Sequence, residues 1–218
     1  MQLTEFAVDF AHDTVYLAQH FREFISVNDS LKYAVFLITF NPVYWNIVAR
    51  LEYKTHFLTK IFGGSAKLGC YFLAFTIFTL GLYRDHVYNA ALAEQPTYWP
   101  YLENPVVTAL ALALFGWGSV LVVTSMWALG VTGTYLGDYF GILMSERVTG
   151  FPFNVNDNPM YNGSTLCFLG TALWYAKPAG IAVAAYVFIM YRVALWFEEP
   201  FTAMIYRNKA AQDAKKAS

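Results

Sequence analysis

Long stretches with few or no charges alternate with short polar segments along the chain. Mostly apolar runs cover residues 33–49, 68–83, 104–137, 164–176 and 181–197. A membrane-spanning α-helix needs about 20 predominantly apolar residues, so the third run can cross and the first two approach the lower limit. The pattern therefore predicts an all-α fold, an integral membrane helical bundle with about four to five membrane helices.

The last two runs are separated by Lys177-Pro178-Ala179-Gly180. Lys-Pro is typical of a turn, and proline is favoured at the first position of a helix. The run before this turn has about the length of a re-entrant segment, whereas the run after it is nearly long enough to cross. We expect a C-terminal helical hairpin that dips through the membrane.

Residues 1–30 have a different pattern, because acidic and basic residues interleave with apolar ones. This pattern lacks the basic start and apolar block of a signal peptide, and it indicates an amphipathic helix on or near the membrane. The sequence shows no repeat and no separate soluble domain. We expect a single membrane domain over residues 1–218, with residues 1–30 as its amphipathic N-terminal segment.

Composition supports a membrane protein and excludes some partners. Charged residues make up 13% of the chain, about half the share found in an average soluble domain. The net charge of −1 provides no basic surplus for nucleic acid. Cys70 and Cys167 both lie in apolar runs, so we expect buried free thiols and neither a disulfide framework nor a metal site.

Basic residues concentrate in segment 50–67, which has four Lys or Arg residues against Glu52 alone, and in the tail after residue 206. By the positive-inside rule, both segments should face the cytosol. Segment 84–103 should then be lumenal, and its aromatic cluster Tyr98–Tyr101 suits a membrane-interface belt. The chain ends in KKAS, which resembles the dilysine retrieval signal of endoplasmic-reticulum membrane proteins.

Segment 133–163 combines residue types that an ordinary connecting loop has little reason to combine. It holds five glycines, Asp138, Asp157 and several amide and aromatic side chains within thirty-one residues. One explanation is an interfacial loop of turn-forming residues with aromatic anchors. We favour the wall of a binding site, because this density indicates a backbone held close to a polar ligand.

Adjacent carboxylates at Glu198 and Glu199 close the last apolar run, just before Pro200. Two acids at a membrane boundary repel each other and are costly to desolvate. A cation would offset this cost, and it could be Arg192 or a ligand that carries an ammonium group or paired hydroxyls. The sequence leaves these alternatives open.

Gly116-Trp117-Gly118 lies within the third run. Its glycines could form a notch for a neighbouring helix or let a ligand lie against the backbone, and the triplet alone favours the notch. All four histidines precede residue 133, and none pairs at metal-ligand spacing. Among them His86, at the end of the second run, is retained as a candidate proton acceptor.

Longer motifs carry a resemblance to a known family. GTYLGDYFGIL, FPFNVNDNPMYNGSTLCFLG and ALWFEEPFTAMIYR resemble the phospholipid N-methyltransferase family of the endoplasmic reticulum, and FNPVYWNIVARLEYKTHFLTKIFG is similar to its first membrane segment. The likeness extends over residues 40–207 and leans toward the fungal members. It implies methylation, dependent on S-adenosylmethionine, of phosphatidyl-N-methylethanolamine, its dimethyl form or phosphatidylethanolamine toward phosphatidylcholine.

The resemblance also implies residues that bind the cofactor. The family's site for S-adenosylmethionine is attributed to a Gly-x-Gly and a Glu-Glu pair, which fall here on Gly116, Gly118, Glu198 and Glu199. Acids suit the cofactor's ammonium group or ribose diol, whereas backbone amides near glycines suit its carboxylate.

The wider group of integral-membrane methyltransferases has a His-Pro-x-Tyr-x-Gly element that contacts the cofactor. Here Asn158 replaces the histidine, while Pro159, Tyr161 and Gly163 match. The resemblance therefore implies cofactor contacts at the three matching residues, and it does not imply the contact that the histidine makes. We expect further contacts from Tyr135 and Phe153, whose rings could stack on adenine, and from the backbone at Gly137.

The expected reaction is an in-line displacement at the methyl carbon by a neutral amine. Asp138 or Glu199, or a water that either orders, is the expected proton acceptor. Segments 133–163 and 198–207 should form this site at the cytosolic face, with the lipid arriving from the bilayer. The alternatives are an isoprenylcysteine carboxyl methyltransferase-like enzyme, a non-enzymatic lipid-binding protein and an NADPH-dependent sterol reductase. The last needs clustered arginines for a phosphate, and segment 133–163 has only Arg147.

Overall fold

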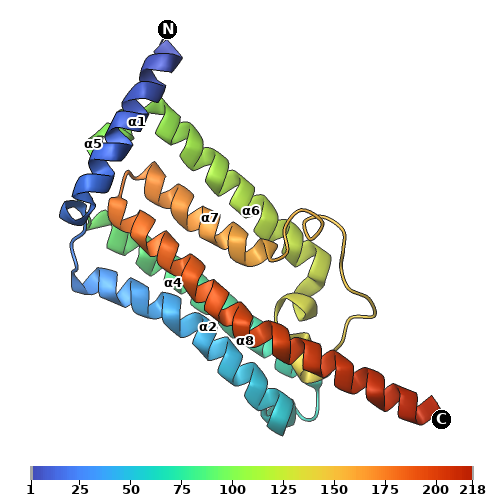
Figure 1. Ribbon diagram of the computed structural model, residues 1–218. Helices are drawn as coiled ribbons and strands as arrows, with labels where there is room; N and C mark the ends of the chain where they lie inside the picture. The colour runs from blue at the N-terminus through green and yellow to red at the C-terminus, as the bar shows by residue number, and fades with distance from the viewer. Residues whose placement is uncertain (1, 218) are drawn as a thin grey trace.

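The computed structural model describes residues 2–217 as a bundle of long helices joined by short segments (Figure 1). No strand occurs within these residues, so the predicted all-α fold is confirmed. The elements in order are α1 (Gln2–His20), η1 (Phe21–Phe24), α2 (Asp29–Thr55), α3 (Phe57–Ile61), α4 (Ala66–Ala93), α5 (Trp99–Glu103), α6 (Pro105–Thr134), η2 (Gly137–Phe140), α7 (Pro159–Trp174) and α8 (Pro178–Ala217).

Four helices, α2, α4, α6 and α8, are long and apolar enough to cross a membrane, and the shorter α7 lies among them. The expected number of membrane helices is therefore confirmed. The helices extend beyond the apolar runs because capping residues lie in the polar segments. Asn28 accepts a hydrogen bond from the Leu31 amide, and Ser65 accepts one from the Leu68 amide, which satisfies amides that the first helical turn leaves free.

The C-terminal hairpin is present as expected, with α7 and α8 antiparallel on either side of Lys177. Ala176 adopts a left-handed conformation with φ of 49°, and the Lys177 amide donates to the Ala172 carbonyl. The Lys177 ammonium donates to the Gln95 carbonyl at 2.7 Å and to Thr97 Oγ1 at 2.9 Å. The turn is thereby fastened to the loop between α4 and α5.

Close contact between glycines joins α6 to α7. A Cβ atom on Gly118 would lie 2.5 Å from the Gly163 carbonyl oxygen, and one on Gly163 would lie 2.7 Å from the Gly118 carbonyl oxygen. Seven residues further along α7, a Cβ on Gly170 would lie 2.8 Å from the Ala111 carbonyl oxygen. Small residues thus let the two backbones touch, as is common between membrane helices.

Helix α1 packs on the end of the bundle that holds α5 and the start of α6 (Figure 1). Its Leu17 is 3% exposed, and the Tyr98 hydroxyl donates to the Asp13 carbonyl at 3.0 Å. Tyr98 and Tyr101 are 4% and 5% exposed, so the expectation of an interface belt is wrong for these two rings. They are covered because α1 lies over them, and only Trp99 between them is strongly exposed.

At the other end of the bundle, Glu52 is fully buried although the sequence suggested a loop acid. Its Oε2 accepts a hydrogen bond from the Leu58 amide at 2.7 Å, and Oε1 accepts one from the Thr59 hydroxyl. Helix α2 continues through this segment to Thr55, and the carboxylate at its end provides acceptors for the first turn of α3.

Candidate functional site

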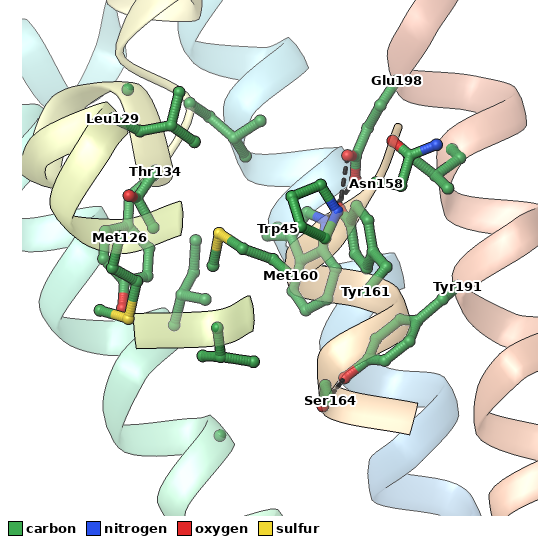
Figure 2. A pocket seen from close by; sticks show the side chains of 18 of the residues that line it. Trp45, Met126, Leu129, Thr134, Asn158, Met160, Tyr161, Ser164, Tyr191 and Glu198 are labelled. Atoms are coloured by element: carbon green, nitrogen blue, oxygen red, sulfur yellow. Dashed lines mark hydrogen bonds between the residues drawn. The ribbon is translucent and has the colours of Figure 1, made fainter. Parts of the chain in front are cut away.

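A cavity of about 1510 Å³ lies within the bundle and is lined by residues of α2, α4, α6, α7, α8 and segment 135–158. Figure 2 shows Met126, Leu129 and Thr134 on one side and Tyr161, Tyr191 and Glu198 on the other, with Met160 between them. Exposed apolar side chains of α4 and α6, such as Leu82 and Val123, also belong to the lining. The cavity therefore reaches the outer surface of the bundle between these two helices.

Glu198 is the most extensively hydrogen-bonded acid of the cavity. Its Oε1 accepts hydrogen bonds from Trp45 Nε1 at 2.6 Å and Asn46 Nδ2 at 2.8 Å, and its Oε2 accepts one from the Tyr161 hydroxyl at 2.6 Å. All three donors are neutral. Among the residues whose side chains the structure describes, no Lys, Arg or His forms an ion pair with Glu198, and a carboxylate held in this way is suited to a cationic ligand.

Arg192 was the side chain that the sequence offered as a partner for the two acids, and the structure does not support that pairing. Arg192 lines the cavity but is exposed, and it makes no ion pair with Glu198 or Glu199. The residues that hold Glu198 come instead from α2 and α7, which a reading of α8 alone could not reveal.

Arg50 supports the turn of α8 that carries Glu198. Its Nη2 donates to the Phe197 carbonyl at 2.7 Å, and its guanidinium lies 4.6 Å from the centre of the Phe201 ring. Pro200 lacks an amide hydrogen and interrupts the helical hydrogen bonds at this turn. Arg50 of α2 thus stabilises α8 at the turn where Pro200 weakens the backbone hydrogen bonding of the helix.

Aromatic rings surround the carboxylate. The ring centres of Tyr161 and Tyr191 lie 4.9 Å apart, and those of Trp45 and Tyr161 lie 6.5 Å apart. All three side chains line the cavity. Aromatic faces attract cations, including alkylated ammonium groups, so the rings and Glu198 favour the same kind of ligand.

Most of the site residues expected from the sequence meet at this cavity. The residues that line it include Tyr135, Asp138, Phe153, Asn158, Pro159, Tyr161, Glu198 and Glu199, together with Asp157. They come from the end of α6, η2, the irregular segment 141–158, the start of α7 and the middle of α8. Segment 133–163 is thus brought to the acid pair in the middle of α8, which begins 35 residues after Gly163 in the chain.

Other expected residues lie elsewhere. Gly118 and Gly163 form the α6–α7 contact, and Gly116 is exposed with no atom within 4 Å of a Cβ built on it. A Cβ on Gly137 would lie 2.6 Å from the Thr132 carbonyl oxygen. His86 is exposed on α4 and does not line the cavity. The roles of these residues in cofactor binding or proton transfer stay predictions.

A second polar group lies along the same cavity and was not found from the sequence. Arg84, which the sequence assigned to a loop, is 8% exposed within α4. Its Nη2 lies 2.8 Å from Asp85 Oδ1, and its Nη1 donates to the Tyr191 hydroxyl at 2.8 Å. The Tyr191 hydroxyl is also 3.1 Å from Ser164 Oγ, and Figure 2 marks this contact with a dashed line.

Comparisons with known proteins agree with the resemblance noted in the motifs. A family model described as phospholipid methyltransferase matches residues 106–209. Phosphatidyl-N-methylethanolamine N-methyltransferase of Saccharomyces cerevisiae is 62% identical over 81% of this chain and 84% of its own length. The protein of that name from Emericella nidulans is 60% identical over 86% of this chain and 90% of its own.

Animal proteins are also similar to the chain. Phosphatidylethanolamine N-methyltransferase of Homo sapiens is 52% identical over 84% of this chain and 92% of its own length. No solved structure matches the chain. The matched region of the family model includes α6, α7 and the part of α8 that carries both acids.

Proposed function

Because the chain belongs to the phospholipid methyltransferase family, we propose that it transfers a methyl group from S-adenosylmethionine to the head-group amine of phosphatidyl-N-methylethanolamine. The dimethyl form is then methylated to give phosphatidylcholine. The observation that carries the proposal is Glu198, a carboxylate held by three neutral donors inside a cavity that reaches the outer surface of the bundle. Both reactants carry cationic groups that such a carboxylate can hold.

The donor set of the cavity fits the proposed cofactor, which supplies a methyl group bound to a positively charged sulfur. Glu198 would hold its ammonium group, and the faces of Tyr135 and Phe153 would pack against its adenine. Thr134 lines the cavity, and its Oγ1 is buried without a hydrogen-bond partner. That hydroxyl is available for a polar group of the cofactor, and satisfying it would remove a desolvation cost.

The acids of the cavity can take the proton that the amine must lose. An amine with the pKa of lysine, about 10.4, costs about 4 to 5 kcal/mol to deprotonate at neutral pH. Alignment of two reactants can contribute about 7 to 11 kcal/mol. Positioning of the reactants by the cavity wall therefore contributes more to lowering the barrier than proton transfer does. Asp138 or Glu199 needs to act only as a modest proton acceptor.

We place the cavity mouth at the cytosolic face of the endoplasmic-reticulum membrane. Segment 50–67, η2 and the C-terminal half of α8 share one buried cluster around Leu58, Tyr139 and Ile205. The basic residues of segment 50–67 and of the tail thus belong to the same end of the bundle as Asp138, and the positive-inside rule assigns that end to the cytosol. The KKAS ending extends to Ser218, which lies outside the described residues.

The function is tested with membranes from a host that makes no phosphatidylcholine. They receive methyl-labelled S-adenosylmethionine and, in separate reactions, the unmethylated, monomethyl or dimethyl lipid. We expect labelled phosphatidylcholine from the monomethyl and dimethyl lipids, and none from the Glu198→Gln variant at equal expression. Absence of label from every lipid amine would refute the proposal, and label in a base-labile ester would indicate carboxyl methylation.

A further inference from the structure

The group around Arg84 is a charged cluster that the proposed methyl transfer does not use. A buried arginine in a membrane-spanning helix is costly and is usually functional. The Arg84 guanidinium has five N–H donors. The Nε hydrogen and one Nη2 hydrogen face Asp85, and one Nη1 hydrogen faces Tyr191. One hydrogen on Nη1 and one on Nη2 are left for a ligand. Arginine binds phosphate through such paired donors. The side chain of Asp85 is 48% exposed, so an anionic group of a ligand can compete with it for the Arg84 guanidinium.

Asn41 gives an independent sign that a polar ligand group enters the cavity. It is 2% exposed and lines the cavity from α2, one helical turn from Trp45. Its side-chain oxygen is buried and has no hydrogen-bond partner. A buried amide oxygen without a partner is costly, and a hydrogen-bond donor of the ligand, such as an amine N–H of the head group, would satisfy it.

We propose that Arg84, with Ser164 and Tyr191, binds the phosphodiester of the lipid substrate, so that the head-group amine points toward the end of the cavity where Glu198 holds the cofactor. This inference rests on the proposed function and adds a phosphate-binding site to it. The Tyr161 hydroxyl contacts Glu198 and the Tyr191 hydroxyl contacts Arg84, and the two tyrosine rings lie 4.9 Å apart. One wall of the cavity therefore has an acidic end and a basic end.

A phosphoethanolamine head group has matching charges, because two carbons separate its ammonium and its phosphate. The ammonium and carboxylate of S-adenosylmethionine share one carbon, so they lie closer together than the ammonium and phosphate of the lipid. With its phosphate at Arg84, the lipid would extend its acyl chains between α4 and α6, where Phe78, Leu82 and Phe115 are exposed lining residues. Its amine would point toward Glu198 and segment 133–163.

The test uses the purified full chain in lipid nanodiscs with two methyl acceptors. One is phosphatidyl-N-methylethanolamine, and the other is a long-chain N-methyl alkylamine that has no phosphate. For Arg84→Met we expect the KM for the phospholipid to rise by at least about 10-fold. The KM for S-adenosylmethionine and the rate with the alkylamine should stay within about 2-fold of wild type. For Arg84→Lys, the KM for the phospholipid should lie between those of wild type and Arg84→Met, because lysine keeps the charge but lacks the paired donors.

Variants of Asp85 distinguish two roles of Arg84, which are phosphate binding and a structural ion pair with Asp85. Asp85→Asn removes the acid that competes for Arg84, so the KM for the phospholipid should stay equal or fall. The double variant Arg84→Met/Asp85→Asn leaves no unpaired charge and keeps the fold testable if Arg84→Met is unstable. We expect the double variant to show the raised phospholipid KM.

The proposal is overturned if the double variant folds and has a normal phospholipid KM, or if both acceptors and the cofactor lose affinity together. Failure of the proposed function is a different result, in which the wild-type chain methylates neither acceptor.

Discussion

Trp45 Nε1 donates a hydrogen bond of 2.6 Å to Glu198 Oε1, which joins residues 153 positions apart in the chain. The bond connects α2, the first membrane helix, with α8, the last one (Figure 1). Trp45 is 9% exposed, so its ring packs in the core while its nitrogen faces the acid. The carboxylate is therefore aimed by a residue that lies outside both segments expected to form the site.

Replacing Trp45 by phenylalanine removes this donor and keeps an aromatic ring. Hydrogen bonds to charged groups contribute about 1.5 to 3 kcal/mol, so kcat/KM should fall by about 10- to 100-fold. Trp196→Phe is the control, because Trp196 lies on the same helix as Glu198 and is 75% exposed. The measurement is the initial rate in nanodiscs, and equal rates for both variants would show that the bond does not aim the acid.

The acids of the cavity should separate by role. Glu198→Gln replaces an oxygen by a donor that faces Trp45, Asn46 or Tyr161, so we expect loss of activity by at least about 100-fold with weaker cofactor binding. Asp138→Asn and Glu199→Gln should lower kcat by about 10- to 100-fold at saturating cofactor, if that residue accepts the proton. Normal turnover in both of the latter variants would remove them as candidates.

The sequence predicted the helices well because each depends on local features. Apolar runs, capping residues and Lys177-Pro178 are visible within short windows, and the number of membrane helices and the C-terminal hairpin followed from them. Ends were less accurate, since α2 and α4 continue into polar segments where charged residues such as Glu52 and Arg84 become buried. Burial of a charge depends on the neighbouring helix, and a window of sequence does not contain that neighbour.

The candidate site was predicted on one wall only. Segment 133–163 and the acid pair are dense in polar residues and could be recognised, and the structure places most of their expected residues on the cavity. Trp45, Asn41 and Tyr191 were not found as site residues because each is a single residue within an apolar helix. The one available signal is the presence of Asn41, Pro42 and Asn46 within run 33–49, because amides and a proline at membrane depth predict packing against a partner without saying which one.

Glu52 should matter for stability and not for catalysis. Glu52→Ala leaves the Leu58 and Thr59 amides of α3 without their acceptor, and unpaired buried groups cost about 1 to 3 kcal/mol each. We expect a lower Tm by thermal unfolding in detergent and an unchanged KM for both substrates. Exposed Glu23 in η1 provides the control Glu23→Ala, and an altered KM in Glu52→Ala would connect this cap to the site.

Gly116 and Gly118 should respond in opposite ways to alanine, because only one of them is in close contact. A methyl group on Gly118 would lie 2.5 Å from the Gly163 carbonyl oxygen, whereas one on Gly116 would meet no atom within 4 Å. Forcing α6 and α7 apart should cost about 1 to 3 kcal/mol, so Gly118→Ala should lower Tm and activity together. Gly116→Ala should keep activity and gain about 0.5 to 1 kcal/mol of helix stability. If Gly116→Ala instead lost cofactor binding while Gly118→Ala kept its Tm, the pair would act on the cofactor directly and the packing explanation would fail.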